Sequence, residues 1–294
     1  MGDCVIYLRE ENVMAFECIR SETTEDGVLV LTLDDTATRN ALGVQLTAEL
    51  EGEVDRCGQD PALRVLVITG ADPAFCSGAN VRGFNRAVQQ REAQGSPPTP
   101  SPWEILDPAY MADSLHEAMG PAIVRKLWNL QKPTIAAVNG AAYGLGCGLA
   151  LSCDIRIASE AARFSEAFVR NGLIPADGSA WQLPRLIGLS NTLLLQYTGD
   201  AVDGQEAFRM GLCSKVVPHK ALMDTTMALA TRLAQGPTFA MSLIKLLVHK
   251  AQQQDLAEHL AQAARAQQLA RQTEDHKEGV QAFLEKRPPH FTGH

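Results

Sequence analysis

The chain has 294 residues, of which 46% are hydrophobic and 20% charged, as in an ordinary soluble globular protein. Its 26 Lys and Arg against 34 Asp and Glu give a net charge of −8, which disfavours nucleic acid and anionic membranes as partners, because both are recognised by clustered positive charge. No apolar run reaches the roughly 18 residues that span a bilayer, and the first 20 residues do not form a signal peptide.

The seven cysteines are widely spaced and contain no C-x-x-C pair. Such spacing indicates neither a disulfide framework nor a zinc site. We therefore expect reduced thiols, a cytoplasmic location and no bound metal.

Short runs rich in β-branched residues predict buried strands at 28–33, 65–69, 134–138 and 155–158. Between the first two, apolar residues recur every four positions from Leu42 to Val54, which is typical of an amphipathic helix. A second helix is expected over 145–153. Strands that alternate with helices indicate an α/β fold.

The remaining segments have weaker patterns. Residues 1–17 are expected to form an N-terminal extension, and residues 87–112, rich in Pro, Gly and Ser, a surface loop that is either a lid or an ordinary insertion. The chain ends in one long predicted helix over 251–285, whose thin apolar stripe favours a subunit contact. We divide the rest into an α/β core over 18–200 and a C-terminal helical region over 201–294.

Two glycine-rich turns each follow a predicted strand, one at 74–80 and one at 139–148. Small residues let the backbone approach a ligand closely, and a helix N-terminus offers free N–H groups. Two such turns that converge would aim two donors at one oxygen, as in an oxyanion hole. Neither turn has the glycine order of a dinucleotide fingerprint or of a phosphate-binding loop.

These turns resemble the two signatures of the crotonase (enoyl-CoA hydratase/isomerase) superfamily. The first is Phe75-Cys76-Ser77-Gly78-Ala79-Asn80, and the second joins the segment at 132–140 to Gly144-Leu145-Gly146 and Cys153-Asp154. The likeness extends over about 18–291. It implies a crotonase-like spiral of β-β-α turns, a C-terminal helical trimerisation region, and homotrimers or dimers of trimers. It also implies an acyl-coenzyme A thioester as substrate, with no cofactor besides the coenzyme A that the substrate carries.

The same resemblance assigns roles to residues. The oxyanion donors would be the backbone N–H groups of Ala79 and Leu145. The implied substrate-binding residues are Ala37, Arg39, Ala41, Ser77, Gly78, Ala79, Asn80, Val81, Gly144, Leu145 and Phe168. Arg39, and more weakly Arg82 and Arg86, could meet the coenzyme A phosphates, or could be solvated surface charges.

The chain departs from the family at the two glutamates that hydratases use. Gly148 and Phe168 stand at those positions, and neither can move a proton. Two carboxylates remain as candidate catalytic groups. Asp177 could transfer protons or could cap the next helix, and Glu166 could act in catalysis or in an ion pair.

We therefore expect thioester-enolate chemistry without ordinary two-glutamate hydration. A single carboxylate suits isomerase-like proton transfer, and apolar neighbours (Phe168, Ile174 and Trp181) would raise the pKa of Asp177. The alternatives are a non-catalytic acyl-CoA-binding protein, which would bind without turnover, and a structural protein, which would have no affinity for coenzyme A.

Overall fold

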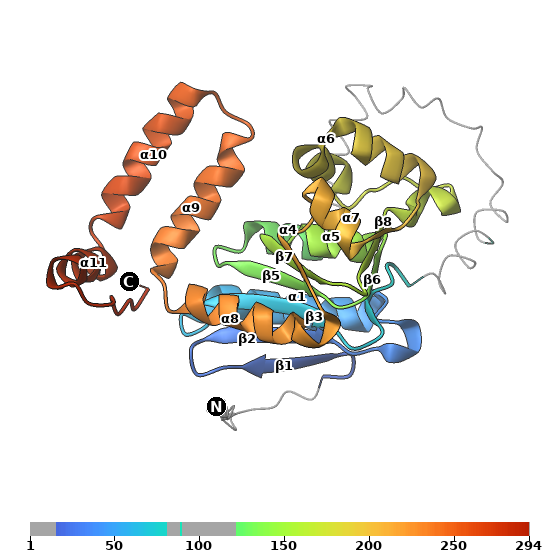
Figure 1. The fold of residues 1–294 in the computed structure, drawn as a ribbon, viewed down its shortest axis with the longest axis horizontal. Coiled ribbons are helices and arrows are strands. Elements are labelled where there is room, and N and C mark those ends of the chain that lie inside the picture. Colours follow the sequence, from blue (N-terminus) through green and yellow to red (C-terminus); the bar gives the residue numbers. More distant parts are fainter. Residues whose placement is uncertain (1–15, 81–88, 90–121, 294) are drawn as a thin grey trace.

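The computed structural model describes residues 16–80, 89 and 122–293 (Figure 1). Its larger sheet has six strands in the order β1-β2-β3-β5-β7-β10, in which only β1 runs antiparallel to its neighbour. The strands are β1 (Ile19–Thr23), β2 (Val28–Leu33), β3 (Val65–Gly70), β5 (Thr134–Val138), β7 (Ile155–Ser159) and β10 (Lys215–Val217). All four strands predicted from the sequence are confirmed.

A smaller sheet has four short strands in the order β4-β6-β8-β9. They are β4 (Ala74–Cys76), β6 (Ala141–Tyr143), β8 (Arg163–Ser165) and β9 (Val202–Asp203). Each of β4, β6 and β8 directly follows a strand of the larger sheet, so the chain passes repeatedly from one sheet to the other. This arrangement confirms the predicted α/β fold of β-β-α turns.

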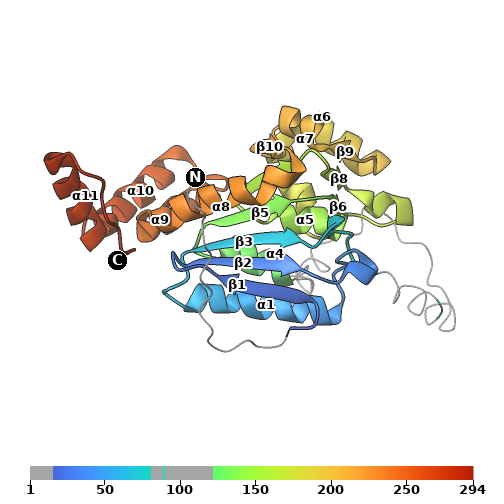
Figure 2. The ribbon, with the colours of Figure 1, turned by 60° about the horizontal axis from the view of Figure 1, so that its bottom comes forward.

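Both faces of the larger sheet are covered at its centre, which explains why β2, β3 and β5 are nearly continuous apolar runs. Side chains alternate between faces along β2. Leu29, Leu31 and Leu33 join the core beneath α1 (Val44–Gln59) and α4 (Ala122–Asn129), whereas Val28 and Val30 pack with α8 (Leu222–Ala234) on the other face (Figure 2).

Three further helices lie over or beside the smaller sheet. They are α5 (Leu145–Leu151), α6 (Ser179–Thr198), which is kinked at Gly188, and α7 (Gly204–Met210). Short 3-10 turns are η1 (Thr36–Thr38), η4 (Ala167–Asn171) and η5 (His219–Ala221). Residues 166–179 include η4 and the loop into α6. This segment lies close to α5, since Asp177 is packed against Gly148.

The C-terminal helices extend away from the sheets (Figure 1). They are α9 (Thr238–Ala251), α10 (Leu256–Ala270) and α11 (Glu274–Glu285). The prediction of one long helix over 251–285 is wrong, because α10 and α11 start at separate N-caps. Asp255 Oδ1 accepts a hydrogen bond from Glu258 N at 2.9 Å, and Thr273 Oγ1 accepts one from His276 N at 3.0 Å.

Some predictions lie outside the described residues. They are most of the N-terminal extension, nearly all of the loop over 87–112, and the side chains of Val81, Arg82 and Arg86. Within 16–80, 89 and 122–293, no helix has the length and apolarity to cross a bilayer.

Candidate active site

The first glycine-rich turn is held against the segment before α1 by backbone hydrogen bonds. Ser77 N donates to Arg39 O at 3.0 Å, and Leu42 N donates to Gly78 O at 2.8 Å. Leu42 and Ala79 form an isolated parallel bridge. In that register the N–H group of Ala79 donates to no acceptor within the described chain.

Asn40 fastens the same segment to β4. Its buried side chain donates to Ala74 O at 2.8 Å and to Ala71 O at 2.9 Å. Arg39 and Asn40 both adopt left-handed backbone angles, with φ of 58° and 59°. The bend leaves the Arg39 side chain exposed, and it forms no ion pair with any described residue.

The second turn leads into α5. Gly144 is the N-cap, with φ 50°, and its N–H group donates to Ser165 O at 2.8 Å. Leu145 is the first residue of the helix, so its N–H group has no partner within the helix. Among the described residues it has none elsewhere.

The glycines allow the two turns to meet. A β-carbon at Gly78 would lie 2.7 Å from Tyr143 O and 3.8 Å from Leu145 N, and one at Gly146 would lie 2.8 Å from Cys76 C. Distances below 3.0 Å do not occur for real β-carbons. Ala79 and Leu145, both half-buried, are thereby brought close together.

Other predicted substrate-binding residues lie around these turns. Ala41 is buried and Ala37 is exposed before α1. The Phe168 ring lies over the second turn, 3.7 Å from where a β-carbon on Gly144 would be. The Ser77 hydroxyl donates to Thr38 O at 2.8 Å, and this hydrogen bond stabilises the turn.

Asp177 occupies the space that a side chain at position 148 would need. A β-carbon on Gly148 would lie 2.7 Å from Asp177 Cγ. The carboxyl group is buried, with 2% of the residue exposed. Gly148 follows Leu145 by three residues, a rise of about 4.5 Å along α5, so the carboxyl group lies against the first turn of the helix that begins at Leu145.

The alternative that Asp177 caps the next helix is confirmed in part, with the position shifted by one residue. Gly178 is the N-cap of α6, with φ 86°, and Asp177 precedes it. Asp177 Oδ1 still accepts a hydrogen bond from Ser179 N at 3.1 Å. Its other oxygen, Oδ2, is buried and has no hydrogen-bond partner in the described part of the chain.

Glu166 lies beside Asp177 and is only 1% exposed. Its Oε2 accepts a hydrogen bond from Ser179 Oγ at 2.6 Å, and its Oε1 is buried without a partner among the described residues. No described cation pairs with it, so the ion-pair alternative is not supported. Sequence reasoning missed Ser179, whose only signal was its place two residues after Asp177.

Burial dominates the electrostatics of this cluster. It raises the pKa of Glu166 to about 7, and the nearby charge of Asp177 adds to the rise. Burial also raises the pKa of Asp177. The neighbouring Cys147 thiol has a pKa well above its ordinary value for the same reason. Ile174, expected to help desolvate Asp177, is instead 74% exposed.

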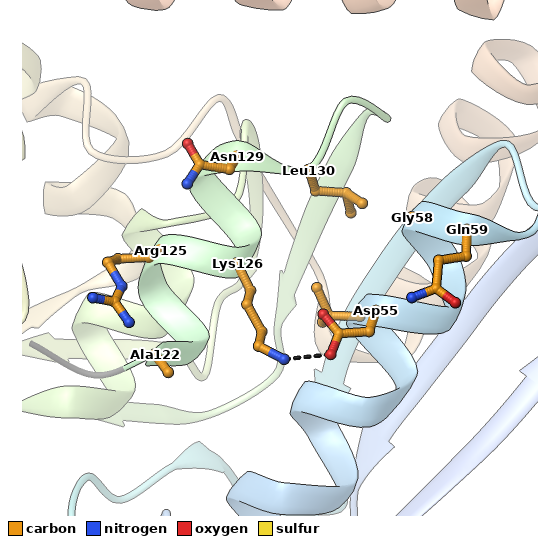
Figure 3. A pocket seen from close by; sticks show the side chains of 9 residues that line it. Asp55, Gly58, Gln59, Ala122, Arg125, Lys126, Asn129 and Leu130 are labelled. Atoms are coloured by element: carbon orange, nitrogen blue, oxygen red, sulfur yellow. Dashed lines mark hydrogen bonds and ion pairs between the residues drawn. The ribbon is translucent and has the colours of Figure 1, made fainter. Parts of the chain in front are cut away.

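Two cavities lie away from the glycine-rich turns. One of about 420 Å³ lies between α1 and α4, where Lys126 and Asp55 form an ion pair and Arg125 adds to the lining (Figure 3). One of about 180 Å³ lies among Trp128, Trp181 and His249. The described residues contain no group of His, Cys, Asp and Glu that could hold a metal ion.

Comparison with known proteins gives matches over nearly the whole chain. The family model described as Enoyl-CoA hydratase/isomerase matches residues 23–107 and 104–294. The chain is 36% identical to 1,2-epoxyphenylacetyl-CoA isomerase of Escherichia coli K12, over 92% of this chain and 96% of that protein. It is 34% identical to crotonyl-CoA hydratase of Syntrophomonas wolfei, over 95% of this chain and 99% of that protein. The crystal structure of enoyl-CoA hydratase from Bacillus anthracis has a TM-score of 0.78 at 30% identity, and the match covers 95% of this chain and all of that one.

Proposed function

Because the chain belongs to the enoyl-CoA hydratase/isomerase family, we propose that it moves a proton along the acyl chain of an enoyl-CoA thioester, as an isomerase does. One observation carries this proposal. The Asp177 carboxyl group fills the space beside Gly148, where the first hydratase glutamate would project. One acid therefore stands where the usual first acid is missing.

The oxyanion hole would consist of the Ala79 and Leu145 N–H groups. Neither donates a hydrogen bond within the described chain, and the two turns touch. When a proton leaves the α-carbon, negative charge develops on the thioester oxygen. Two fixed donors stabilise that charge, and loss of one costs about 3 kcal/mol in the transition state.

Asp177 would be the base. Its carboxylate takes a proton from the α-carbon of a 3-enoyl-CoA, and the electrons of that C–H bond delocalise onto the thioester oxygen as a dienolate. The protonated Asp177 carboxyl group, which can exchange its proton with solvent, then donates a proton to the γ-carbon, which places the double bond between the α- and β-carbons. The raised pKa of Asp177 makes its carboxylate a stronger base than an exposed aspartate.

Hydration is disfavoured because it needs a second group to activate water. The second glutamate position is Phe168, whose ring covers Gly144. Each missing acid or base typically lowers a rate by about 10²–10⁴-fold. We expect crotonyl-CoA to be hydrated slowly or not at all.

The experiment offers the protein matched 3-enoyl-CoA and crotonyl-CoA thioesters in heavy water and follows both by mass spectrometry. We expect the 3-enoyl-CoA to become its 2-enoyl isomer and to gain deuterium, with little 3-hydroxyacyl-CoA from crotonyl-CoA. Rapid hydration would contradict the proposal. Tight binding without turnover would instead identify a non-catalytic acyl-CoA-binding protein.

The Ala79 donor can be removed separately, because proline has no N–H group. We expect Ala79→Pro, once circular dichroism shows that it is folded, to retain thioester binding but to lose most of the exchange. Normal activation of the thioester by this folded variant would show that Ala79 is not a donor.

A further inference from the structure

The proposed proton transfer gives no role to the second buried carboxylate, Glu166. We infer that Glu166 is a positioning residue that acts on Asp177 through Ser179. This inference rests on the proposed function, since it concerns how the same base is held and when it is ionised.

Ser179 contacts both carboxyl groups with different atoms. Its backbone N–H group donates to Asp177 Oδ1 at 3.1 Å, and its hydroxyl donates to Glu166 Oε2 at 2.6 Å. Ser179 is fully buried at the first position of α6, so neither hydrogen bond competes with bulk water. Each carboxyl group retains one buried oxygen, Asp177 Oδ2 and Glu166 Oε1, without a partner in the described chain.

Among the described residues, no positive charge pairs with the two carboxyl groups, although the buried Arg156 guanidinium acts on the neighbouring Cys147 thiol. The group that faces the pair from α5 is the Cys147 thiol, which stays neutral because burial raises its pKa far above the ordinary value. From α6 the neutral side chain of Gln196 approaches Glu166. No described Lys, Arg or His forms an ion pair with either carboxylate. Two like charges buried together disfavour each other's ionisation.

The pair is therefore expected to titrate in two steps. Glu166 keeps its proton to a pH of about 7, and burial raises the pKa of Asp177 as well. While Glu166 is protonated, its link to Asp177 through Ser179 adds no charge beside the base. When Glu166 loses its proton, a second negative charge appears near Asp177 and changes the pKa of Asp177.

This predicts a distinctive pH dependence. The rate of α-proton exchange should rise with the ionisation of Asp177 and show a second inflection near pH 7. In Glu166→Gln the second inflection should disappear while exchange itself persists. In Glu166→Asp, which retains a carboxyl group, an inflection should remain. Glu160→Gln, the same change at an exposed position, should match the wild-type profile.

The hydroxyl of Ser179 can be tested by Ser179→Ala, which retains the N–H group that Asp177 accepts. We expect a roughly tenfold lower kcat with unchanged KM, equivalent to about 1.4 kcal/mol. Chemical shifts of a ¹³C-labelled Glu carboxyl group, read across pH 4–9, would report the Glu166 ionisation without relying on activity.

The outcomes separate the two proposals. If wild-type and Glu166→Gln profiles coincide, the positioning role is wrong while the proposed function stands. If exchange disappears in Glu166→Gln at every pH in a folded protein, Glu166 is itself the base and the inference is overturned. If the wild type exchanges no proton at any pH, or Asp177→Asn exchanges normally, the proposed function fails.

Discussion

The residue at position 148 decides whether Asp177 can occupy its observed place. Any β-carbon there would overlap the Asp177 carboxyl group. We expect Gly148→Ala to displace that group, to lower the free energy of unfolding by about 1–3 kcal/mol and to reduce exchange. Urea unfolding and the exchange assay measure the two effects.

Gly52→Ala is the matched control, because Gly52 lies in α1 with no atom within 4 Å of an added β-carbon. It should raise stability by up to about 1 kcal/mol and leave exchange unchanged. A Gly148→Ala variant with wild-type stability and exchange would contradict the packing described here.

Glu166 should also make stability depend on pH. Its pKa is about 7 in the native state against an ordinary 4.5, so between these values the native state holds a proton that the unfolded chain has released. The free energy of unfolding therefore falls as pH rises from about 4.5 to 7, by at most roughly 3 kcal/mol. Chemical denaturation at several pH values should show a smaller fall in Glu166→Gln, and parallel curves would argue against this titration.

The sequence predicted part of this chemistry at the residue scale. The family resemblance placed Gly148 and Phe168 at the two hydratase glutamate positions and left Asp177 as a candidate acid. That Asp177 lies against Gly148, and that Ser179 links it to Glu166, could not, because these residues lie on separate elements that only the fold brings together.

At the scale of elements, α10 and α11 show where sequence periodicity misleads. The apolar stripe of α10, from Leu256 to Leu269, had suggested one helix that continues to 285. The stronger signal was Thr273 followed by two acidic residues, which is typical of a helix N-terminus. The N-cap at Thr273 thus marks the start of a new helix, whereas apolar spacing alone would have extended the previous one.

That cap gives a prediction for the element. Thr273→Ala removes the hydroxyl that accepts the His276 N–H group, and should destabilise α11 by about 1 kcal/mol. Hydrogen exchange of the α11 amides would detect the change. Gln272→Ala, one residue earlier, should have little effect, and equal effects of the two variants would show that Thr273 is not the cap.

At the scale of the whole molecule, the C-terminal helices expose a large apolar surface. Leu256, Phe283 and Leu284 are 72%, 82% and 74% exposed. Burial of such side chains contributes about 1.5–3 kcal/mol each. We propose that α10 and α11 pack against other copies of the chain, as the sequence suggested for a trimer or hexamer.

Sedimentation velocity tests this surface. The wild type should sediment as a trimer or a hexamer at micromolar concentration, and the double variant Phe283→Glu with Leu284→Glu should dissociate. Val44→Glu makes an equally drastic change at a 93% exposed site on α1, and this variant should not dissociate. A wild-type monomer would contradict the proposal.

The four central strands of the larger sheet, β2, β3, β5 and β7, were predictable because they are largely buried and read as apolar runs. The edge strands β1 and β10 were not predicted, because their side chains are mostly polar or partly exposed. The second sheet was not visible in that pattern, because β4, β6, β8 and β9 have only two or three residues each. Its existence followed from the family resemblance, which the two glycine-rich turns carry.

The central claim is that Asp177 transfers the proton, and the most direct measurement is deuterium incorporation into a 3-enoyl-CoA thioester in heavy water. Asp177→Asn keeps the oxygen that accepts the Ser179 N–H group but removes the titrating acid. We expect exchange to fall at least about 100-fold with little change in thermal stability, while Asp224→Asn, an exposed control, exchanges normally. Wild-type exchange by folded Asp177→Asn would contradict the claim.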